Sequence, residues 1–104
     1  MIIDLTKETF AKETAQGLVA VDFWATWCGP CRMMAPVLEE ADQNIADLKI
    51  CKVNVDDQGD LAAQFRVQAI PTLVIMRDGK VVRTEVGYHD YEALEAIIDA
   101  ARKA

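Results

Sequence analysis

The sequence predicts an α/β protein in which helices flank a central, mixed, five-stranded sheet. Two apolar runs, Leu18–Trp24 and Thr72–Met76, are typical of strands buried on both faces. Segments with helical periodicity separate the strands, and strands linked by a helix should run parallel. Asp78-Gly79 predicts a two-residue hairpin, which adds an antiparallel pair. The length of 104 residues suits one compact domain, residues 1–104.

Short signals predict the N-terminal elements. Ile2-Ile3 is expected to form a first strand. Thr6 is expected to cap a helix that ends near Gly17, with Glu8 in its first turn. The first apolar run then follows as the second strand.

A longer helix is predicted to begin at about Pro30. Pro36 falls inside this helix and should kink it, because proline removes a backbone hydrogen bond and clashes with the preceding turn. The core-facing side of the helix is marked by apolar residues at helical spacing, namely Met34, Leu38, Ala41 and Ile45.

The second half of the chain is predicted to contain three strands and two helices. Asp90 can cap the last helix, and Gly87 ends the strand before it. The expected elements are a strand over Leu48–Val55, a short helix that includes Leu61, Ala62 and Phe65, a strand over Thr72–Met76, its hairpin partner through Val81-Val82, and a final helix with Tyr91, Leu94, Ile98 and Ala101 on one face.

Composition narrows the function classes. The net charge of −6 argues against a nucleic-acid partner, because an acidic surface repels phosphate. No apolar run reaches membrane-spanning length, and Met1–Leu5 lacks the features of a signal peptide, while a transit peptide removed before Met1 stays an open alternative. Three cysteines do not resemble a secreted disulfide framework, so a reducing, cytoplasmic compartment is expected.

Two cysteines, Cys28 and Cys31, enclose Gly29-Pro30 where the second strand gives way to the long helix. A thiolate at a helix N-terminus gains roughly 0.3–2 kcal/mol from the helix dipole, and about 1.4 kcal/mol lowers a pKa by one unit. Cys28 is therefore predicted to be the nucleophile. Cys31, inside the first turn and less exposed, is predicted to resolve the mixed disulfide. Pro30 suits the first helical turn, where its missing N–H needs no partner.

A structural role for this cysteine pair is weaker than a redox role. A disulfide that closes a four-residue loop stabilises a fold by only about 2 kcal/mol. Zinc needs four ligands, and the remaining donors, Cys51 and His89, lie in a predicted buried strand and a predicted surface loop. We therefore expect no metal site. Cys51 is expected to be a small buried hydrophobe, and a regulatory role for it stays an alternative.

Asp22 is the one charged residue in the first apolar run. Burial there would raise its pKa, and a neutral carboxyl group near Cys31 could take and return the proton of that thiol. The alternative is that Asp22 points to a solvated edge and has no catalytic role. Lys52, in the neighbouring strand, is its candidate electrostatic partner.

Aromatic and proline residues near the cysteines allow two interpretations each. Trp27, next to Cys28, either packs or forms an apolar surface for substrates, and Trp24 is expected in the core. Pro71 opens a strand, and the residue pattern by itself favours an ordinary trans bond between Ile70 and Pro71.

The region around the cysteine pair resembles the active-site motif of the thioredoxin family. Further segments, in the family's order and at similar spacing, extend the resemblance over essentially the whole chain. A lone pair of cysteines at this spacing is a weak signal, but the full set is highly specific. The matching segments are Trp27-Cys28-Gly29-Pro30-Cys31, Val21-Asp22-Phe23-Trp24-Ala25, Pro36, Lys52-Val53-Asn54-Val55-Asp56, Ile70-Pro71-Thr72, Asp78-Gly79 and Val86-Gly87.

The resemblance implies the thioredoxin fold, with Asp22 buried behind the cysteines and a cis bond between Ile70 and Pro71 that places Pro71 against the disulfide. It also implies that the Ile70 backbone pairs with an extended client strand, for which Gly87 leaves room. The expected site residues are Cys28, Cys31 and Asp22 for catalysis, and Trp27, Gly29, Pro30, Lys52, Ile70, Pro71 and Gly87 for binding or support.

The resemblance further implies a monomeric protein-disulfide reductase that carries electrons in cell redox homeostasis. A Gly-Pro pair between the cysteines is similar to the reducing members of the superfamily. The implied partners are disulfide-bonded client proteins and a thioredoxin reductase that draws on NADPH, and the chain itself is expected to need no cofactor. A redox-idle binding module and an oxidant or isomerase of the same fold stay as alternatives.

Some positions depart from the family's pattern. Arg32 stands where a lysine is common, and the charge is kept. Tyr88-His89 follow Gly87 where smaller residues are usual, so their bulk bears on the choice of partner. Cys51 is an additional thiol outside the motif.

Overall fold

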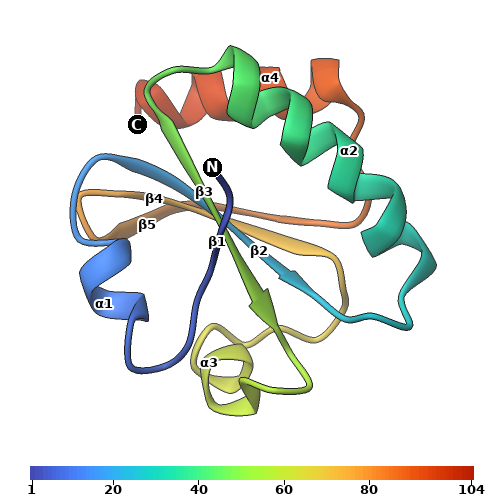
Figure 1. Ribbon diagram of the computed structural model, residues 1–104. Coiled ribbons are helices and arrows are strands. Elements are labelled where there is room, and N and C mark those ends of the chain that lie inside the picture. Colours follow the sequence, from blue (N-terminus) through green and yellow to red (C-terminus); the bar gives the residue numbers. More distant parts are fainter.

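The computed structural model describes all residues, 1–104, and its elements follow the predicted order β-α-β-α-β-α-β-β-α (Figure 1). None of the helices combines the length and the apolar composition needed to cross a bilayer. The elements are β1 (Ile3–Asp4), α1 (Phe10–Glu13), β2 (Leu18–Trp24), α2 (Gly29–Asn44), β3 (Leu48–Asn54), α3 (Gly59–Gln64), β4 (Thr72–Arg77), β5 (Lys80–Val86) and α4 (Tyr91–Arg102).

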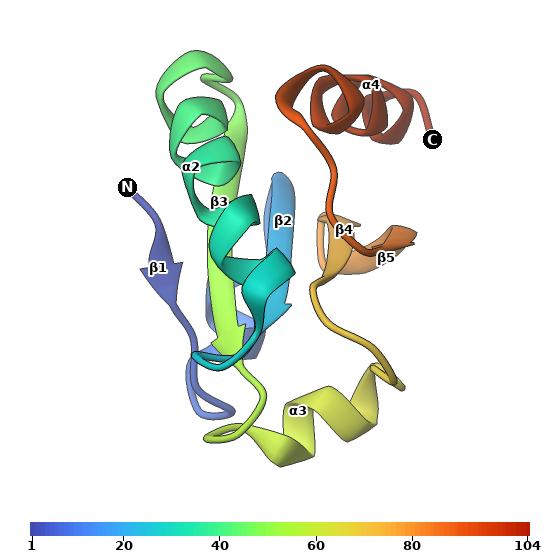
Figure 2. The same cartoon turned by 90° about the vertical axis from the view of Figure 1, so that its right-hand side faces the viewer.

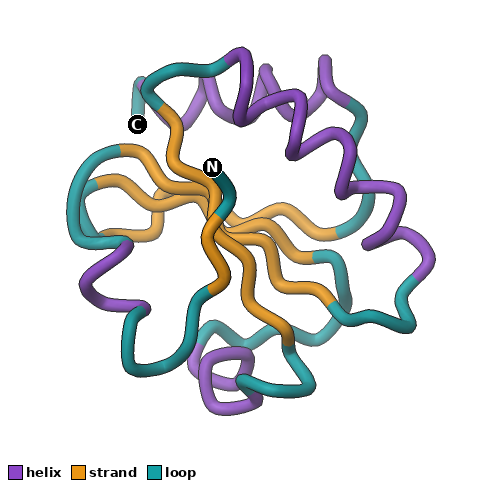
Figure 3. The backbone as a smooth tube through the Cα atoms, viewed as in Figure 1, coloured by secondary structure: helices purple, strands orange, loops and turns teal.

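The five strands, orange in Figure 3, form one mixed sheet, and their order is β1-β3-β2-β4-β5. β1, β3 and β2 run parallel, and β4 is antiparallel to both β2 and β5. β2 and β4 are inner strands and are almost fully buried, as their apolar runs predict. The predicted mixed sheet is therefore confirmed.

The helices cover both faces of the sheet (Figure 2). α2 and α4 pack on one face, where their apolar sides meet Ala20, Ile50 and Ile75. α1 and α3 cover the other face through Phe10 and Leu61. The sheet therefore has a hydrophobic core on each face. Because side chains alternate along a strand, each inner strand contributes residues to both of these cores.

The hairpin turn and the last helix form as predicted. Asp78 and Gly79 have φ angles of 50° and 83°, the left-handed pair that a type I′ turn requires. The Asp78 carboxylate also accepts a hydrogen bond of 2.8 Å from the N–H of Gly17. At the start of α4 the Asp90 carboxylate accepts a hydrogen bond of 2.9 Å from the N–H of Ala93, which confirms the predicted cap.

The first helix is shorter than predicted, and Thr6 is not its cap. Thr6 begins a turn in which its carbonyl accepts from the N–H of Thr9 and of Phe10, at 3.1 and 2.9 Å. The Thr9 hydroxyl instead accepts from the Thr6 N–H at 3.0 Å. The Thr9 side chain therefore closes the turn that leads into the helix. At the other end, the Thr14 hydroxyl donates to the Phe10 carbonyl at 2.8 Å, just after the helix ends.

α2 begins at the cysteine pair and continues through Pro36. Proline has no N–H, so the Arg32 carbonyl lacks its usual partner four residues on, and the kink at Pro36 stays a prediction. The predicted core face is confirmed over Met34, Leu38 and Ala41. Ile45, at the end of the helix, is buried in the same core.

Candidate active site

The cysteine pair lies at the junction between β2 and α2. Cys28 is the N-cap of α2 with extended backbone angles, φ −90° and ψ 114°. Its Sγ accepts a hydrogen bond of 3.2 Å from the N–H of Cys31. The two sulfurs form a disulfide, with the Cα atoms 5.2 Å apart. The sulfur of Cys28 therefore lies at the positive end of the helix, where a thiolate is stabilised.

The two cysteines do not differ in exposure. Both are 4% exposed, so the prediction that Cys31 is the less exposed of the two is wrong for the disulfide form. Their bond brings each sulfur against the other, and Ala25, Trp24, Val55 and Ile70 pack around the pair. What distinguishes Cys28 is its N-cap position, whereas Cys31 lies inside the helix.

The Ile70–Pro71 bond is cis, so the trans bond that the residue pattern favours is wrong and the bond implied by the family resemblance is confirmed. A trans bond is the statistical default, and local sequence contains no signal against it. The Ile70 carbonyl oxygen lies 3.7 Å from Cys28 Sγ. The Pro71 carbonyl accepts a hydrogen bond of 2.8 Å from the N–H of Gly87. The segments before β4 and after β5 are therefore joined beside the disulfide.

Gly87 has a φ of 97°, a left-handed angle that glycine adopts at no steric cost. No atom lies within 4 Å of the position that a Cβ would take, so open space adjoins its backbone. Its neighbours Val86 and Tyr88 are 61% and 43% exposed. The structure therefore places open space and two exposed apolar side chains at this end of β5.

Asp22 is buried, with 1% of its surface exposed, which rules out a solvated edge. Alternation along β2 puts it on the same face as Ala20, the face that α2 covers. Its Oδ1 has no hydrogen-bond partner. Burial raises the pKa of Asp22 to about 6, and the opposing charge of Lys52 limits the rise. Near neutral pH both protonation states of this carboxyl group are therefore accessible.

Lys52 is the neighbour of Asp22 across the β2–β3 ladder. Both residues occupy the same side of the sheet, because Ile50 and Ala20 two positions earlier share one core. The Lys52 ammonium lies 4.3 Å from the ring centroid of Trp24, a cation–π contact. The predicted pairing of Lys52 with Asp22 is thus electrostatic, with no hydrogen bond between them.

Trp27 is 67% exposed, so it is not a core residue. Its indole N–H donates to the Asp56 carboxylate at 2.8 Å, which fixes the ring beside the cysteines. The sequence contains Asp56 within a segment that matches the family but assigns it no role, because nothing in a loop aspartate after β3 indicates a partner 29 positions earlier. An apolar hollow of about 170 Å³ adjoins the ring, and it is lined by Trp27, Val55, Ala62, Val67, Gln68, Ala69 and Ile70.

Trp24 and Cys51 take the packing roles that the sequence predicts. Trp24 is half-buried and packs beside the cysteine pair. Cys51 is fully buried in the core on the α1/α3 side, so the sheet separates it from Cys31 on α2. Burial raises the pKa of the Cys51 thiol to about 11, which keeps it protonated at neutral pH.

This arrangement defines a class of protein. A disulfide that spans two residues at a helix N-terminus, beside a cis-proline and an apolar surface, fits a thiol–disulfide oxidoreductase.

Comparison with known proteins makes this class specific. Residues 1–100 match the family model "Thioredoxin". The chain is 48% identical to a thioredoxin of Bacillus subtilis over 99 residues, which cover 94% of this chain and 95% of the relative. It is 50% identical to one of Listeria monocytogenes over 95% of this chain and 97% of the relative. A thioredoxin of Pseudomonas aeruginosa is 42% identical, over 95% and 94% of the two chains.

The chain belongs to the thioredoxin family, and its fold is the thioredoxin fold. It is a thiol–disulfide oxidoreductase of the disulfide-reductase type.

Proposed function

We propose that this protein reduces disulfides of cytoplasmic client proteins and is itself reduced by a thioredoxin reductase that uses NADPH. The observation that carries the proposal is the Cys28 sulfur, which caps α2 and accepts the N–H of Cys31 beside the carbonyl of Ile70. The chain needs no cofactor for this reaction, because the two electrons reside in its own dithiol.

In the first step the Cys28 thiolate attacks one sulfur of the client disulfide. A bond forms between Cys28 and that sulfur, the client's S–S bond breaks, and the other client sulfur leaves as a thiolate that takes a proton from water. The N-cap position favours the attacking thiolate through the N–H of Cys31 and the helix dipole.

In the second step Cys31 loses its proton and attacks Cys28. The Cys28–Cys31 bond forms, the mixed disulfide breaks, and the client leaves with both sulfurs reduced. We assign the acceptance of the Cys31 proton to the ionised Asp22 carboxylate, which lies on the α2 side of β2 and has a pKa of about 6. Lys52 moderates that pKa through its charge.

We assign client binding to the surface around the disulfide, at the end of the sheet where β2 and β5 finish and β4 begins. The Ile70 backbone pairs with an extended client strand, and the open space beside Gly87 admits that strand. Trp27 presents an apolar surface beside the hollow, while Gly29, Pro30 and Pro71 shape the backbone around the cysteines. We further propose that residues 1–104 act as one domain and as a monomer, because helices cover both faces of the sheet.

Coupled turnover tests the proposal. A disulfide-bonded protein, NADPH and a bacterial thioredoxin reductase are mixed with the chain, and NADPH oxidation is followed. Turnover is expected with the natural chain and with the control Cys51→Ser, and it should be absent with Cys28→Ser. Cys31→Ser should accumulate a mixed disulfide through Cys28. Turnover by Cys28→Ser would overturn the mechanism, and a redox potential close to that of glutathione would favour an isomerase.

A further inference from the structure

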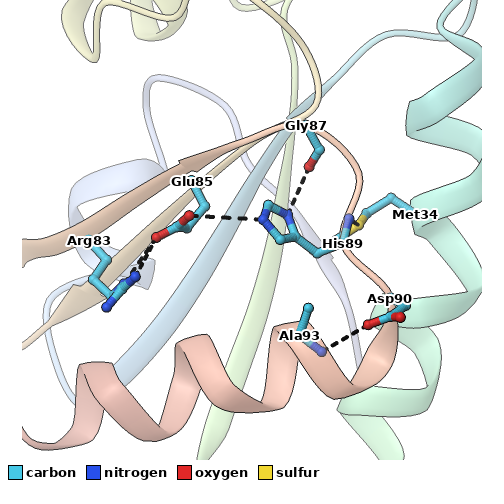
Figure 4. Close-up of polar contacts among 7 residues, drawn as sticks. All are labelled: Met34, Arg83, Glu85, Gly87, His89, Asp90 and Ala93. Atoms are coloured by element: carbon cyan, nitrogen blue, oxygen red, sulfur yellow. Dashed lines mark hydrogen bonds and ion pairs between the residues drawn. The ribbon is translucent and has the colours of Figure 1, made fainter.

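His89 lies in the loop between β5 and α4, and its side chain is 20% exposed. Its Nδ1 is 3.0 Å from the carbonyl oxygen of Gly87, and its Nε2 is 3.9 Å from Oε1 of Glu85 (Figure 4). Its backbone N–H donates to the sulfur of Met34 on α2 at 3.4 Å. The loop is therefore attached on both sides of Tyr88, because Gly87 N–H also donates to the Pro71 carbonyl at 2.8 Å.

The imidazole ring faces two acceptors, and this matters for its protonation state. The Gly87 carbonyl lies within hydrogen-bond distance of Nδ1, whereas the Glu85 carboxylate, 3.9 Å from Nε2, can attract the ring only through charge. A neutral imidazole can donate to Gly87 but offers Glu85 no charge. The imidazolium donates to Gly87 and also forms an ion pair with Glu85. The imidazolium is therefore the form of the ring that suits both the Gly87 carbonyl and the Glu85 carboxylate.

Three elements pack around the ring, and two of them carry charges. On β5, Glu85 attracts the imidazolium, while Arg83 donates to the other oxygen of Glu85 at 2.6 Å and reduces that attraction. On α4, the Asp90 carboxylate caps the helix and the helix N-terminus opposes a cation. Glu92 adds a negative charge in the first turn of α4, and the contact from α2 is the uncharged Met34.

We propose that His89 is a positioning residue that holds the Gly87–Tyr88 segment beside the cis-proline, and that it does so more firmly as imidazolium. In the neutral state the Nδ1–H tautomer keeps the Gly87 bond but turns a lone pair toward Glu85. Protonation converts that opposition into an ion pair without loss of the Gly87 bond.

The consequence for the reaction rests on the proposed role of Gly87 in client binding. A segment held in place offers the client strand a preformed edge, so less ordering is required when the client binds. His89 is not assigned any contact with the reacting sulfurs. Its effect should therefore appear in KM for protein clients and leave kcat unchanged.

Nuclear magnetic resonance tests the positioning directly, because His89 is the one histidine of the chain and its ring signals need no assignment. The oxidised protein is titrated from pH 5 to 8 in an Asp22→Asn background, which removes the buried carboxyl group that titrates near pH 6. The neutral ring is expected as the Nδ1–H tautomer, and the Gly87 and Tyr88 amide signals should follow its midpoint. An Nε2–H tautomer, or amide signals that ignore the ring, would overturn the proposal.

Steady-state kinetics tests the consequence. KM for His89→Phe is divided by KM for the natural chain at each pH. Any pH dependence of KM that comes from the thiols or from Asp22 is common to both proteins and drops out of this ratio. We expect a ratio of about threefold to tenfold at pH 8, the range of the one hydrogen bond to Gly87 that the neutral ring keeps, and a larger ratio at pH 6, where the ion pair with Glu85 is added. His89→Asn, which offers a non-titrating N–H near the Nδ1 position, should match the natural chain at pH 8 and recover only part of the loss at pH 6.

A control variant and a separate test distinguish the failure of this inference from the failure of the proposed function. Glu95→Gln, at an exposed position further along α4, is the matched control and should behave as the natural chain. Equal KM ratios at both pH values, or a change in kcat instead, would overturn the inference about His89. That result would leave the dithiol mechanism standing, because the mechanism is tested separately by Cys28→Ser.

Discussion

Cys28 and Cys31 differ in backbone position, and that difference assigns their roles. Cys28 precedes the helix, so its sulfur can accept an N–H from the first turn. Cys31 lies within the helix and supplies that N–H. The same hydrogen bond that stabilises the attacking thiolate also holds the resolving residue next to it.

Asp22→Asn should slow the resolution of the mixed disulfide. The amide cannot accept the Cys31 proton, so water has to take it, and we expect a loss of at least about tenfold, against roughly 10²–10⁴ for a general base. In the natural chain the rate should rise through pH 6 as Asp22 ionises. Quenched-flow measurement of the mixed disulfide checks this, with the exposed Asp60→Asn on α3 as control. Equal rates for Asp22→Asn and the natural chain would remove Asp22 from the mechanism.

At the scale of single residues, the sequence predicts chemistry better than contacts. The helix-start position of Cys28 follows from its neighbours along the chain. For Asp22 those neighbours leave burial and a solvated edge open, and the structure shows that it is buried. The contact of Trp27 with Asp56 does not, because it joins residues whose proximity depends on the finished fold. The cis bond before Pro71 came from family resemblance alone, since about 5% of such bonds are cis and no adjacent residue marks this one.

Among the elements, α4 allows a direct test of how much a predicted N-cap contributes to stability. Asp90→Ala removes the acceptor of the Ala93 N–H and should lower the free energy of unfolding by about 1 kcal/mol. Chemical denaturation at pH 7 measures the loss. Glu95→Ala, at an exposed position in the same helix, should have little effect. A loss as large for Glu95→Ala as for Asp90→Ala would show that helix propensity, and not the cap, is responsible.

Long elements with a clear period agree with the prediction, and the bounds of α1 do not. The strand over Leu18–Trp24 has the predicted bounds, because seven consecutive residues share one environment. α1 is only four residues long, and its position is decided by the burial of Phe10 and by two threonine hydroxyls. Local propensity is too weak in one turn to outweigh such contacts.

For the whole molecule, the buried carboxyl group makes stability depend on pH. The folded pKa of Asp22 is raised from 3.8 to about 6, so the folded state holds this proton more tightly than the unfolded chain. The cost of ionising Asp22 is therefore absent below pH 3.8, grows from there to pH 6, and is constant above it. Across two pKa units it reaches about 3 kcal/mol.

The free energy of unfolding of Asp22→Asn, minus that of the natural chain, isolates this effect. The difference should increase by roughly 2 kcal/mol between pH 4 and pH 7, because part of the total is already present at pH 4. Other carboxylates, such as Glu13 and Asp47 with lowered pKa values, act in the opposite sense but cancel in the subtraction. Denaturation of the oxidised forms at several pH values measures the difference. If this difference in the free energy of unfolding does not change with pH, the pKa of Asp22 is the same in the folded and unfolded states, which would contradict the account.

The site itself is a product of topology. Cys28 follows β2, Pro71 precedes β4 and Gly87 follows β5, and the strand order places these three ends at one edge of the sheet. The sequence predicts each segment and the mixed sheet, but the order β1-β3-β2-β4-β5 depends on how the helices pack on both faces. The residue pattern therefore predicts the separate motifs, whereas their assembly into one site is implied only by the family resemblance.

The account depends most on a stabilised thiolate at Cys28, and alkylation of the reduced protein as a function of pH measures it directly. Mass spectrometry of the modified peptides reports each cysteine separately. Cys28 should react with a midpoint clearly below that of an ordinary thiol, because its thiolate is stabilised at the N-terminus of α2, while buried Cys51 stays unmodified. A Cys28 midpoint at or above about 8.5, or a lower midpoint at Cys31, would contradict the account.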